Sequence, residues 1–338
     1  MATSQSGSEL IPVTESNFTR AEAHLYFGNS LKGGGAGRFH HVREVISIDN
    51  QTVIRANRDT LYSSGVFDLD AGPVTVTLSD AGGRFMSMIA IDEDEYAVET
   101  VYAPGRFTYT KERVGTRYVL LGLRTFVDPN DPKDIEMVHA LQDSVRADQP
   151  ATGTFEFPNW DPVSQKNVRE DLIKRAGSLP DTQGMFGQRG KVDPERHLIG
   201  AATGWGGNAP DDALYLTVVP AKNDGQTVHK LTVTGDVPVD GFWSISVYGA
   251  DGYFHKNDQH CVLDQQRDGE ESARWFGDDP VRWLRRQDCQ LHSHHGRMEL
   301  PHAVCIHFVA PELSAQHPVL LPRPNHHEHG VRCPSQQR

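Results

Sequence analysis

The stretch that decides the fold runs Arg55-Ala-Asn-Arg-Asp-Thr-Leu-Tyr-Ser-Ser-Gly-Val-Phe-Asp-Leu69. Its first five residues include two arginines, an asparagine and an aspartate. After them, Leu61, Gly65 and Phe67 alternate with Tyr62, Ser64 and Val66. This alternation predicts one β-strand from Thr60 to Leu69. Four polar side chains at the start of a strand must each find a hydrogen-bond partner or face water. The start is therefore either a structural anchor or part of a binding site.

Further strands follow this one at short intervals. Alternating runs predict strands over residues 74–78, 84–91, 96–102, 106–110 and 116–126. A spacing of about 8–12 residues per strand is typical of an antiparallel sandwich. The acidic run Asp92-Glu-Asp-Glu95 separates two of these strands and lacks the glycine and distal glutamate of a calcium loop. It predicts an exposed hairpin tip.

Helices are predicted where an aspartate precedes a proline. An aspartate can cap a helix whose first residue is proline, and this pair occurs at Asp131-Pro132, Asp161-Pro162 and Asp193-Pro194. These starts predict three short helices in residues 128–204. An earlier helix is expected after Ser16 or Asn17, with Phe18, Ala21 and Leu25 on its apolar face and Glu22 outside.

A second β-region follows the helical segment. Strands are predicted over residues 213–219, 228–234 and 241–248, with a hairpin turn at Asn223-Asp-Gly225. Residues 1–13 are small and polar, which predicts a disordered segment. Four parts are therefore expected before the C-terminal tail: 1–13, 14–127, 128–204 and 205–258.

Composition excludes several classes of partner. The net charge of −12 argues against nucleic acid and against an anionic membrane surface. No apolar run reaches the roughly 20 residues that span a bilayer. The first residues show no basic and apolar leader, so the chain as written is expected to be soluble and cytoplasmic. The oligomeric state is left open.

Several separate blocks point to one family. Asn57-Arg-Asp-Thr-Leu-Tyr-Ser63 and Asp240-Gly-Phe-Trp-Ser-Ile-Ser-Val-Tyr248 are the most specific, with support from Val127–Asp131, Pro158–Asp161, His197–Ala201, Trp205–Asn208 and Pro220–Gly225. With these blocks the chain resembles bacterial proteins built from domain-of-unknown-function family 1254 followed by family 1214, over about residues 14–258. The resemblance implies a mainly β fold: an immunoglobulin-like sandwich, a segment of short helices and a C-terminal jelly-roll-like domain. Members of this family are often exported.

The resemblance ends after Asp258. Residues 261–338 contain no lysine, threonine or tyrosine, but they hold nine of the 17 histidines and all four cysteines, Cys261, Cys289, Cys305 and Cys333. Strand alternation also disappears there. Codons permitted for the residues after His260, read one base later, can encode Ala-Tyr-Ser-Thr-Asn, as the family pattern would. We therefore expect a frameshift near residues 259–261, an incomplete jelly roll and an aberrant, poorly ordered tail over 259–338.

A metal module is the alternative interpretation of this tail. Histidines and a cysteine gather in two places, one at Cys289, His292, His294 and His295 and the other at His326–His329. The spacing matches no structural zinc motif, so neither a metal nor another cofactor is predicted.

The candidate ligand-binding residues come from the family blocks. They are Arg55, Asn57, Arg58, Asp59, Tyr62, Trp205, Asn208, Trp243 and Tyr248. Arginine forks bind carboxylate or phosphate, and aromatic rings stack on sugar faces. The alternative is structural: Arg58 and Asp59 form a buried pair, while Trp243 and Tyr248 pack in the core.

The reaction, if there is one, is not specified by any motif. The chain has no nucleophile elbow, P-loop, Rossmann fingerprint, HExxH or CxxC, so whether it is an enzyme stays open. The first hypothesis is a protein that binds a small polar, anionic or carbohydrate-like ligand. The second is a hydrolase that uses Asp59 or Glu99 as acid or base. The third is a non-functional product of a frameshifted gene.

Overall fold

The computed structural model describes residues 9–51, 57–179, 181–218, 241–248, 253–254, 263–267 and 303–309. The chain divides into two compact units. Unit 1 consists of Met1–Arg43 and Leu61–Ala209, and unit 2 consists of Glu44–Thr60 and Pro210–Arg338. The stretch from Arg55 to Leu69 is therefore divided between the two units, because residues 57–60 belong to unit 2 and residues 61–69 to unit 1.

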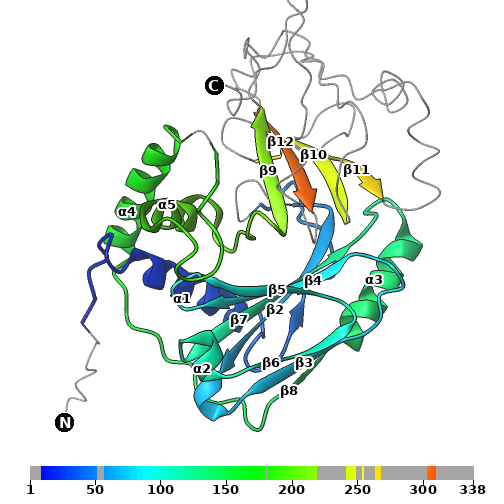
Figure 1. Ribbon diagram of the computed structural model, residues 1–338, viewed down its shortest axis with the longest axis horizontal. Coiled ribbons are helices and arrows are strands. Elements are labelled where there is room, and N and C mark those ends of the chain that lie inside the picture. The colour runs from blue at the N-terminus through cyan, green and yellow to red at the C-terminus, as the bar shows by residue number, and fades with distance from the viewer. Residues whose placement is uncertain are drawn as a thin grey trace, which may run out of the picture. The chain divides into compact units, whose positions relative to one another are not determined.

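Two antiparallel sheets form the centre of unit 1 (Figure 1). The larger sheet has the order β1 (His40–His41), β2 (Thr60–Asp68), β7 (Tyr118–Phe126), β4 (Met86–Asp92) and β5 (Ala97–Tyr102). The smaller sheet has the order β6 (Gly105–Tyr109), β3 (Val74–Leu78) and β8 (Arg146–Asp148). A short 3-10 helix, Leu69–Ala71, follows β2. The predicted sheet-rich fold with antiparallel strands is confirmed.

The main core lies between these two sheets. Phe67, Met88 and Leu121 from the larger sheet pack in one cluster with Val76 and Tyr109 from the smaller sheet. In β3 the valines and the leucine are buried while the two threonines between them are half-buried, as the period of two requires. The alternation that predicted the strands therefore also determines which face meets the core.

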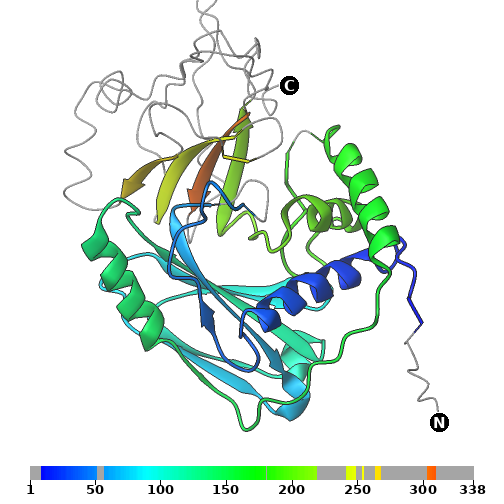
Figure 2. The same cartoon turned by 180° about the vertical axis from the view of Figure 1, so that it is seen from behind.

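The other face of the larger sheet is covered in part by α1 (Phe18–Lys32), as Figure 2 shows. Ala23 and Phe27 of α1 pack against Val66, Ile89 and Leu120 of the sheet. The expected helix is present and begins after Asn17, but its buried face differs from the prediction. Leu25 is 41% exposed, whereas Glu22 is 1% exposed. Because α1 packs against other helices as well as the sheet, its buried arc is wider than an apolar stripe.

The three helices predicted from aspartate–proline pairs are all present. They are α3 (Pro132–Ser144), α4 (Pro162–Ala176) and α5 (Pro194–Gly204). In each case the preceding aspartate accepts hydrogen bonds from backbone N–H groups of the first turn. A fourth short helix, α2 (Lys111–Val114), precedes β7.

A separate hydrophobic cluster joins three helices of unit 1 to the segment that precedes α1. Phe18 of α1, Leu172 of α4 and Ile199 of α5 share it with Val13. Ile11 forms a parallel bridge with Trp160. Val13 and Ile11 lie in the stretch that the composition predicts to be disordered, and they are held there by these contacts.

The described part of unit 2 contains one antiparallel sheet. Its order is β11 (Leu263–Arg267), β10 (Phe242–Tyr248), β12 (Ala303–Val309) and β9 (Ala213–Val218). The expectation that strands disappear after Asp258 is wrong for β11 and β12. Val304, Ile306 and Phe308 alternate along β12 and are strand-forming residue types. The predicted strand 228–234 lies outside the described residues, and the jelly roll stays a prediction.

None of the helices in the described ranges is both long and apolar enough to cross a bilayer.

Candidate functional site

Two predicted site residues of unit 2, Asn57 and Asp59, form a buried hydrogen-bonded anchor with Ser244. The Asp59 carboxylate accepts a hydrogen bond from Asn57 Nδ2 at 2.9 Å and one from the Ser244 hydroxyl at 2.7 Å. Asn57 Oδ1 accepts from the backbone N–H groups of Asp59 and Thr60. Asp59 and Ser244 are fully buried. These bonds tie the start of β2 to β10, which is the structural alternative for this stretch.

Arg58 does not pair with its neighbour. The carboxylate of Asp59 is bonded to Asn57 and Ser244, and the Arg58 guanidinium instead donates to the backbone carbonyl of Ile46. Among the described residues Arg58 forms no ion pair, so the predicted Arg58–Asp59 pair is wrong. Adjacent residues at a strand start point in different directions, which separates the two charges. Burial lowers the pKa of Arg58.

The other predicted residues are divided between the two units. Trp243 is buried in unit 2. Unit 1 holds Tyr62, Trp205 and Asn208. Trp205 stacks on Tyr26 with ring centroids 4.3 Å apart. Arg55 and the side chain of Tyr248 lie outside the described residues.

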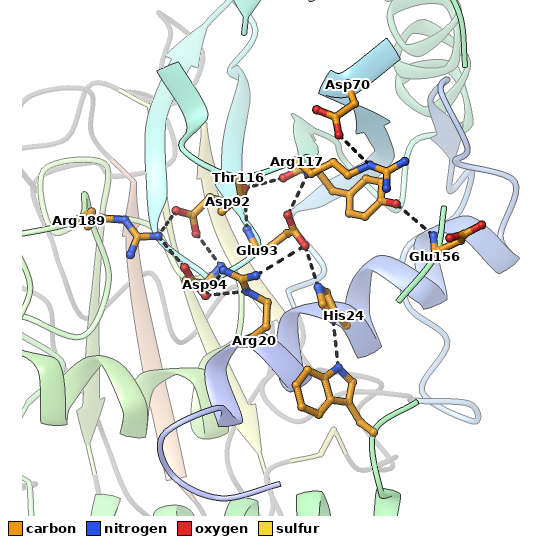
Figure 3. Close-up of polar contacts among 12 residues, drawn as sticks. Arg20, His24, Asp70, Asp92, Glu93, Asp94, Thr116, Arg117, Glu156 and Arg189 are labelled. Atoms are coloured by element: carbon orange, nitrogen blue, oxygen red, sulfur yellow. Dashed lines mark hydrogen bonds and ion pairs between the residues drawn. The ribbon is translucent and has the colours of Figure 1, made fainter. Parts of the chain in front are cut away.

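The acidic turn between β4 and β5 is not the exposed tip that its composition predicts. Asp92, Glu93 and Glu95 are 1%, 6% and 4% exposed. Figure 3 shows that three side chains from two other segments reach these carboxylates. Arg189 approaches Asp92 at 2.7 Å, Arg20 approaches Asp94 at 2.7 Å, and His24 Nε2 lies 2.9 Å from Glu93. Cations on α1 and on the loop before α5 thus allow the acidic turn to be buried.

The pKa values of the turn follow from these contacts. Burial acts to raise the pKa of Glu93, but the bonds from His24 and the Tyr118 N–H and the charge of Arg20 outweigh it, so the pKa lies below its ordinary value. The Asp94 pKa is likewise lowered, because Arg20 and Arg189 outweigh burial. Burial prevails at Asp92 and raises its pKa despite Arg189. The turn is a charge-neutralising network, and the described residues contain no group of three or more ligands able to hold a metal ion.

Glu95 differs from the other three acids. Its backbone is left-handed, with φ of 67°, and one carboxyl oxygen accepts from the Gly206 N–H at 3.2 Å. The other oxygen, Oε2, has no hydrogen-bond partner in the part of the chain that is described. Burial, opposed by the Gly206 bond and assisted by nearby Glu22 and Asp92, raises the pKa of Glu95 well above its ordinary value. Burial therefore favours the neutral, protonated form of Glu95.

The least compensated charge in unit 1 belongs to Arg124 on β7. Arg124 is 8% exposed, and its side chain forms no hydrogen bond or ion pair with any described residue. Its guanidinium carbon lies 5.7 Å from the ring centroid of Phe85, which in turn meets Tyr102 edge-on at 5.8 Å. A ring face attracts a cation but accepts no strong hydrogen bond. Nη2 of Arg124 is buried without a hydrogen-bond partner among the described residues, so its two N–H donors are left for another group.

The strand register gives Arg124 its neighbours. Ser87 of β4 stands directly opposite Arg124 on one side and Tyr102 on the other, so one row across the sheet reads Tyr102, Ser87, Arg124. The next row on the same face reads Thr100, Ile89, Gly122.

Tyr62 belongs to this face as well. Tyr62 and Val66 project from the same side of β2, since residues two apart share a face, and Val66 packs with Ile89. The predicted site residue Tyr62 and the unpredicted Arg124 therefore lie on one side of the larger sheet. A charged residue inside the apolar run Val119-Leu-Leu-Gly-Leu-Arg-Thr-Phe126 is the sequence signal that would have identified Arg124.

Two comparisons with known proteins concern the fold. The VPA0106 protein from Vibrio parahaemolyticus is similar with a TM-score of 0.60 and 15% identity, over 88% of this chain and 93% of that chain. An uncharacterized protein from Burkholderia cenocepacia gives a TM-score of 0.42 and 10% identity, over 90% of this chain and 85% of that chain, which is too low to support an argument. The first likeness concerns the fold alone.

Comparisons of the sequence with curated proteins and with family models test the predicted family resemblance. A search of curated proteins finds no match. The predicted resemblance to family 1254 is supported over part of its range, and the part assigned to family 1214 stays a prediction. Residues 36–113, which include the stretch from Arg55 to Leu69, match the family described as "Protein of unknown function (DUF1254)".

Proposed function

We propose that this protein binds a small anionic ligand and that Arg124 supplies the positive charge for it. The observation that supports this proposal is the state of Arg124: nearly fully buried, with no hydrogen bond and no carboxylate partner in the described residues. Four other described arginines, Arg38, Arg58, Arg106 and Arg146, also have no ion pair there. Arg38, Arg106 and Arg146 are exposed to water, and Arg58 is half-buried and already donates to a backbone carbonyl. Arg124 is therefore the stronger candidate.

The energetic argument favours an anion over a neutral molecule. Removing a charged group from water without a partner costs several kcal/mol, even after relaxation. A carboxylate placed against the guanidinium would restore both the counter-charge and up to two parallel hydrogen bonds. The rings of Phe85 and Tyr102 add apolar surface beside the charge. A guanidinium beside aromatic rings suits the anionic ligand that the sequence predicts. The arginine is Arg124, however, and not Arg55 or Arg58.

Hydrolysis is the less favoured alternative. Asp59 is engaged by Asn57 and Ser244. Glu99 forms an ion pair with Arg113 at 2.6 Å. Glu99 points to the opposite face of β5 from Thr100, so it does not share the face of Arg124. Binding without catalysis therefore needs no free carboxylate to act as acid or base, whereas hydrolysis does.

Calorimetry with a simple carboxylate tests the proposal. Hexanoate should bind the full chain, and Arg124→Gln should weaken that binding at least tenfold, because glutamine retains hydrogen bonding but not charge. Arg106→Gln is the matched control, since Arg106 is an exposed arginine on β6 and its loss removes the same charge from the other sheet. Equal hexanoate affinity in the wild type and in Arg124→Gln would overturn the proposal.

We also infer that residues 261–338 are translated from a shifted reading frame. The support is compositional, namely the absence of lysine, threonine and tyrosine together with all four cysteines in this one segment. The nucleotide sequence around the codon of Asp258 decides the matter. If the neighbouring frame encodes no alternating strands of the family pattern, the inference is abandoned.

A further inference from the structure

We propose that the anion bound at Arg124 is a hydroxylated carboxylate, whose hydroxyl groups are recognised by Thr100 and Ser87. This inference rests on the proposed function, because it names the ligand class of the same site. It requires three things of the sheet face: a single positive charge, hydroxyl groups at suitable spacing, and room beside the charge.

The charge on this face matches a monoanion. Within β2, β7, β4 and β5, Arg124 is the only lysine or arginine. One guanidinium balances one carboxylate, whereas a phosphate near neutral pH carries up to two negative charges. A carboxylate is therefore the better electrostatic match.

The hydroxyl groups lie on the same face at short spacing. Ser87 is 2% exposed and faces Arg124 directly, and side chains in such pairs lie about 5 Å apart at Cβ. Thr100 is diagonal to Ser87, at about 7–8 Å. Thr100 Oγ1 is buried and has no hydrogen-bond partner among the residues that the structure describes. A buried hydroxyl without a partner is costly, so a ligand hydroxyl at this place would be recognised strongly.

The second row leaves room beside Arg124. Gly122 stands two residues before Arg124 on the same face of β7 and contributes no side chain there. A Cβ at Gly122 would meet only Ile89 and Leu120, at 3.5 and 3.6 Å, which is ordinary contact. Gly122 is therefore not required by packing against backbone. Its lack of a side chain keeps the face low beside Arg124, and Ile89 stands between Gly122 and Thr100.

Two six-carbon carboxylates separate the parts of the proposal. D-gluconate carries hydroxyl groups along its chain and hexanoate carries none, so their affinities for the full-length protein are compared by calorimetry. We expect gluconate to bind at least tenfold more tightly than hexanoate. Thr100→Val preserves the side-chain shape and should bring gluconate to within about threefold of hexanoate while leaving hexanoate unchanged. Ser87→Ala should act in the same direction, and Thr75→Val, which removes an exposed hydroxyl from β3, should change neither.

The outcomes distinguish this inference from the function on which it rests. If both carboxylates bind equally and both are lost in Arg124→Gln, the anion site stands and the role of the hydroxyl groups is refuted. If gluconate is preferred but Thr100→Val and Ser87→Ala leave the preference intact, the hydroxyl groups are recognised elsewhere and the inference is wrong. If neither carboxylate binds in an Arg124-dependent manner, the proposed function fails and this inference fails with it.

Discussion

At the scale of single residues, two buried groups stand out for opposite reasons. Arg124 is a charge with no ion-pair partner among the described residues, whereas burial raises the pKa of Glu95 and so favours its neutral form. Arginine cannot lose its proton in a protein, so burial leaves it with a need for an anion. A carboxyl group can be neutralised, so the same burial becomes a shift of its pKa.

The proton on Glu95 makes stability depend on pH. The folded protein holds this proton after the unfolded chain has released it, above the ordinary pKa of 4.5, so the free energy of unfolding falls as pH rises from there toward the raised pKa. Glu95→Gln keeps the shape and is neutral at every pH. In urea titrations at pH 5 to 8, the stability of Glu95→Gln relative to wild type should therefore increase with pH, by up to about 1.4 kcal/mol per pH unit.

Glu136→Gln provides the control for this titration, because Glu136 is an exposed glutamate on α3. Its stability should run parallel to that of the wild type across the pH range. A Glu95→Gln curve that also ran parallel would mean that Glu95 is ionised in the folded protein.

At the scale of elements, the helix starts are set by local chemistry. Asp193 accepts hydrogen bonds from the N–H groups of Glu195 and Arg196, at 3.0 and 2.9 Å, and Pro194 occupies the first turn. These interactions need only neighbouring residues, which is why three helices could be placed from aspartate–proline pairs alone. The buried side of α1 could not be placed in this way, because Glu22 is buried through its bonds to Arg169 and Gln165 on α4.

Removing the cap of α5 should cost a moderate amount of stability. Asp193→Ala loses two hydrogen bonds to the first turn and should lower the free energy of unfolding by about 1 kcal/mol, measured by chemical denaturation. Asp193→Asn can accept the same bonds and should stay close to wild type. Equal losses in both variants would assign the effect to the charge of Asp193 and not to capping.

At the scale of the whole molecule, the chain passes between the two units more than once. Residues 44–60 belong to unit 2 although the residues on either side belong to unit 1. Gln51 exchanges two hydrogen bonds of 2.8 Å with the backbone of Phe254, and Asp59 is bonded to Ser244. These partners are separated by about two hundred residues in sequence, as the separations of 203 and 185 show.

A fragment that ends at residue 209 should therefore lose the anchors of residues 44–60. Limited trypsin digestion should cleave the peptide bond after Arg58 faster in fragment 1–209 than in the full chain, because Ser244 and Phe254 are missing. Cleavage after the exposed Arg106 in unit 1 serves as the internal reference and should be equal in both. Equal rates at Arg58 would show that unit 1 alone protects this stretch, and faster cleavage at both sites would show that the fragment is unfolded.

The sequence by itself determined the local structure of this protein. Alternation gave the strand β2 that follows Asn57–Asp59, and aspartate–proline pairs gave α3, α4 and α5, because these signals depend on neighbours within a few residues. It also indicated a resemblance to family 1254, and residues 36–113, which include this stretch, match that family. Arg124 could have been noticed in the same way, as a charge within an apolar strand.

Only the tertiary structure decided which polar groups are satisfied. The acidic turn Asp92–Glu95 reads as a solvated tip, yet Arg20, His24 and Arg189 from distant segments allow it to be buried. Asn57 and Asp59, just before β2, proved to be an anchor to Ser244, and Arg124 proved to lack an ion-pair partner among the described residues. The physical reason is that the free energy of a buried charge depends on what faces it across the fold, and that information is not contained in a local run of residues.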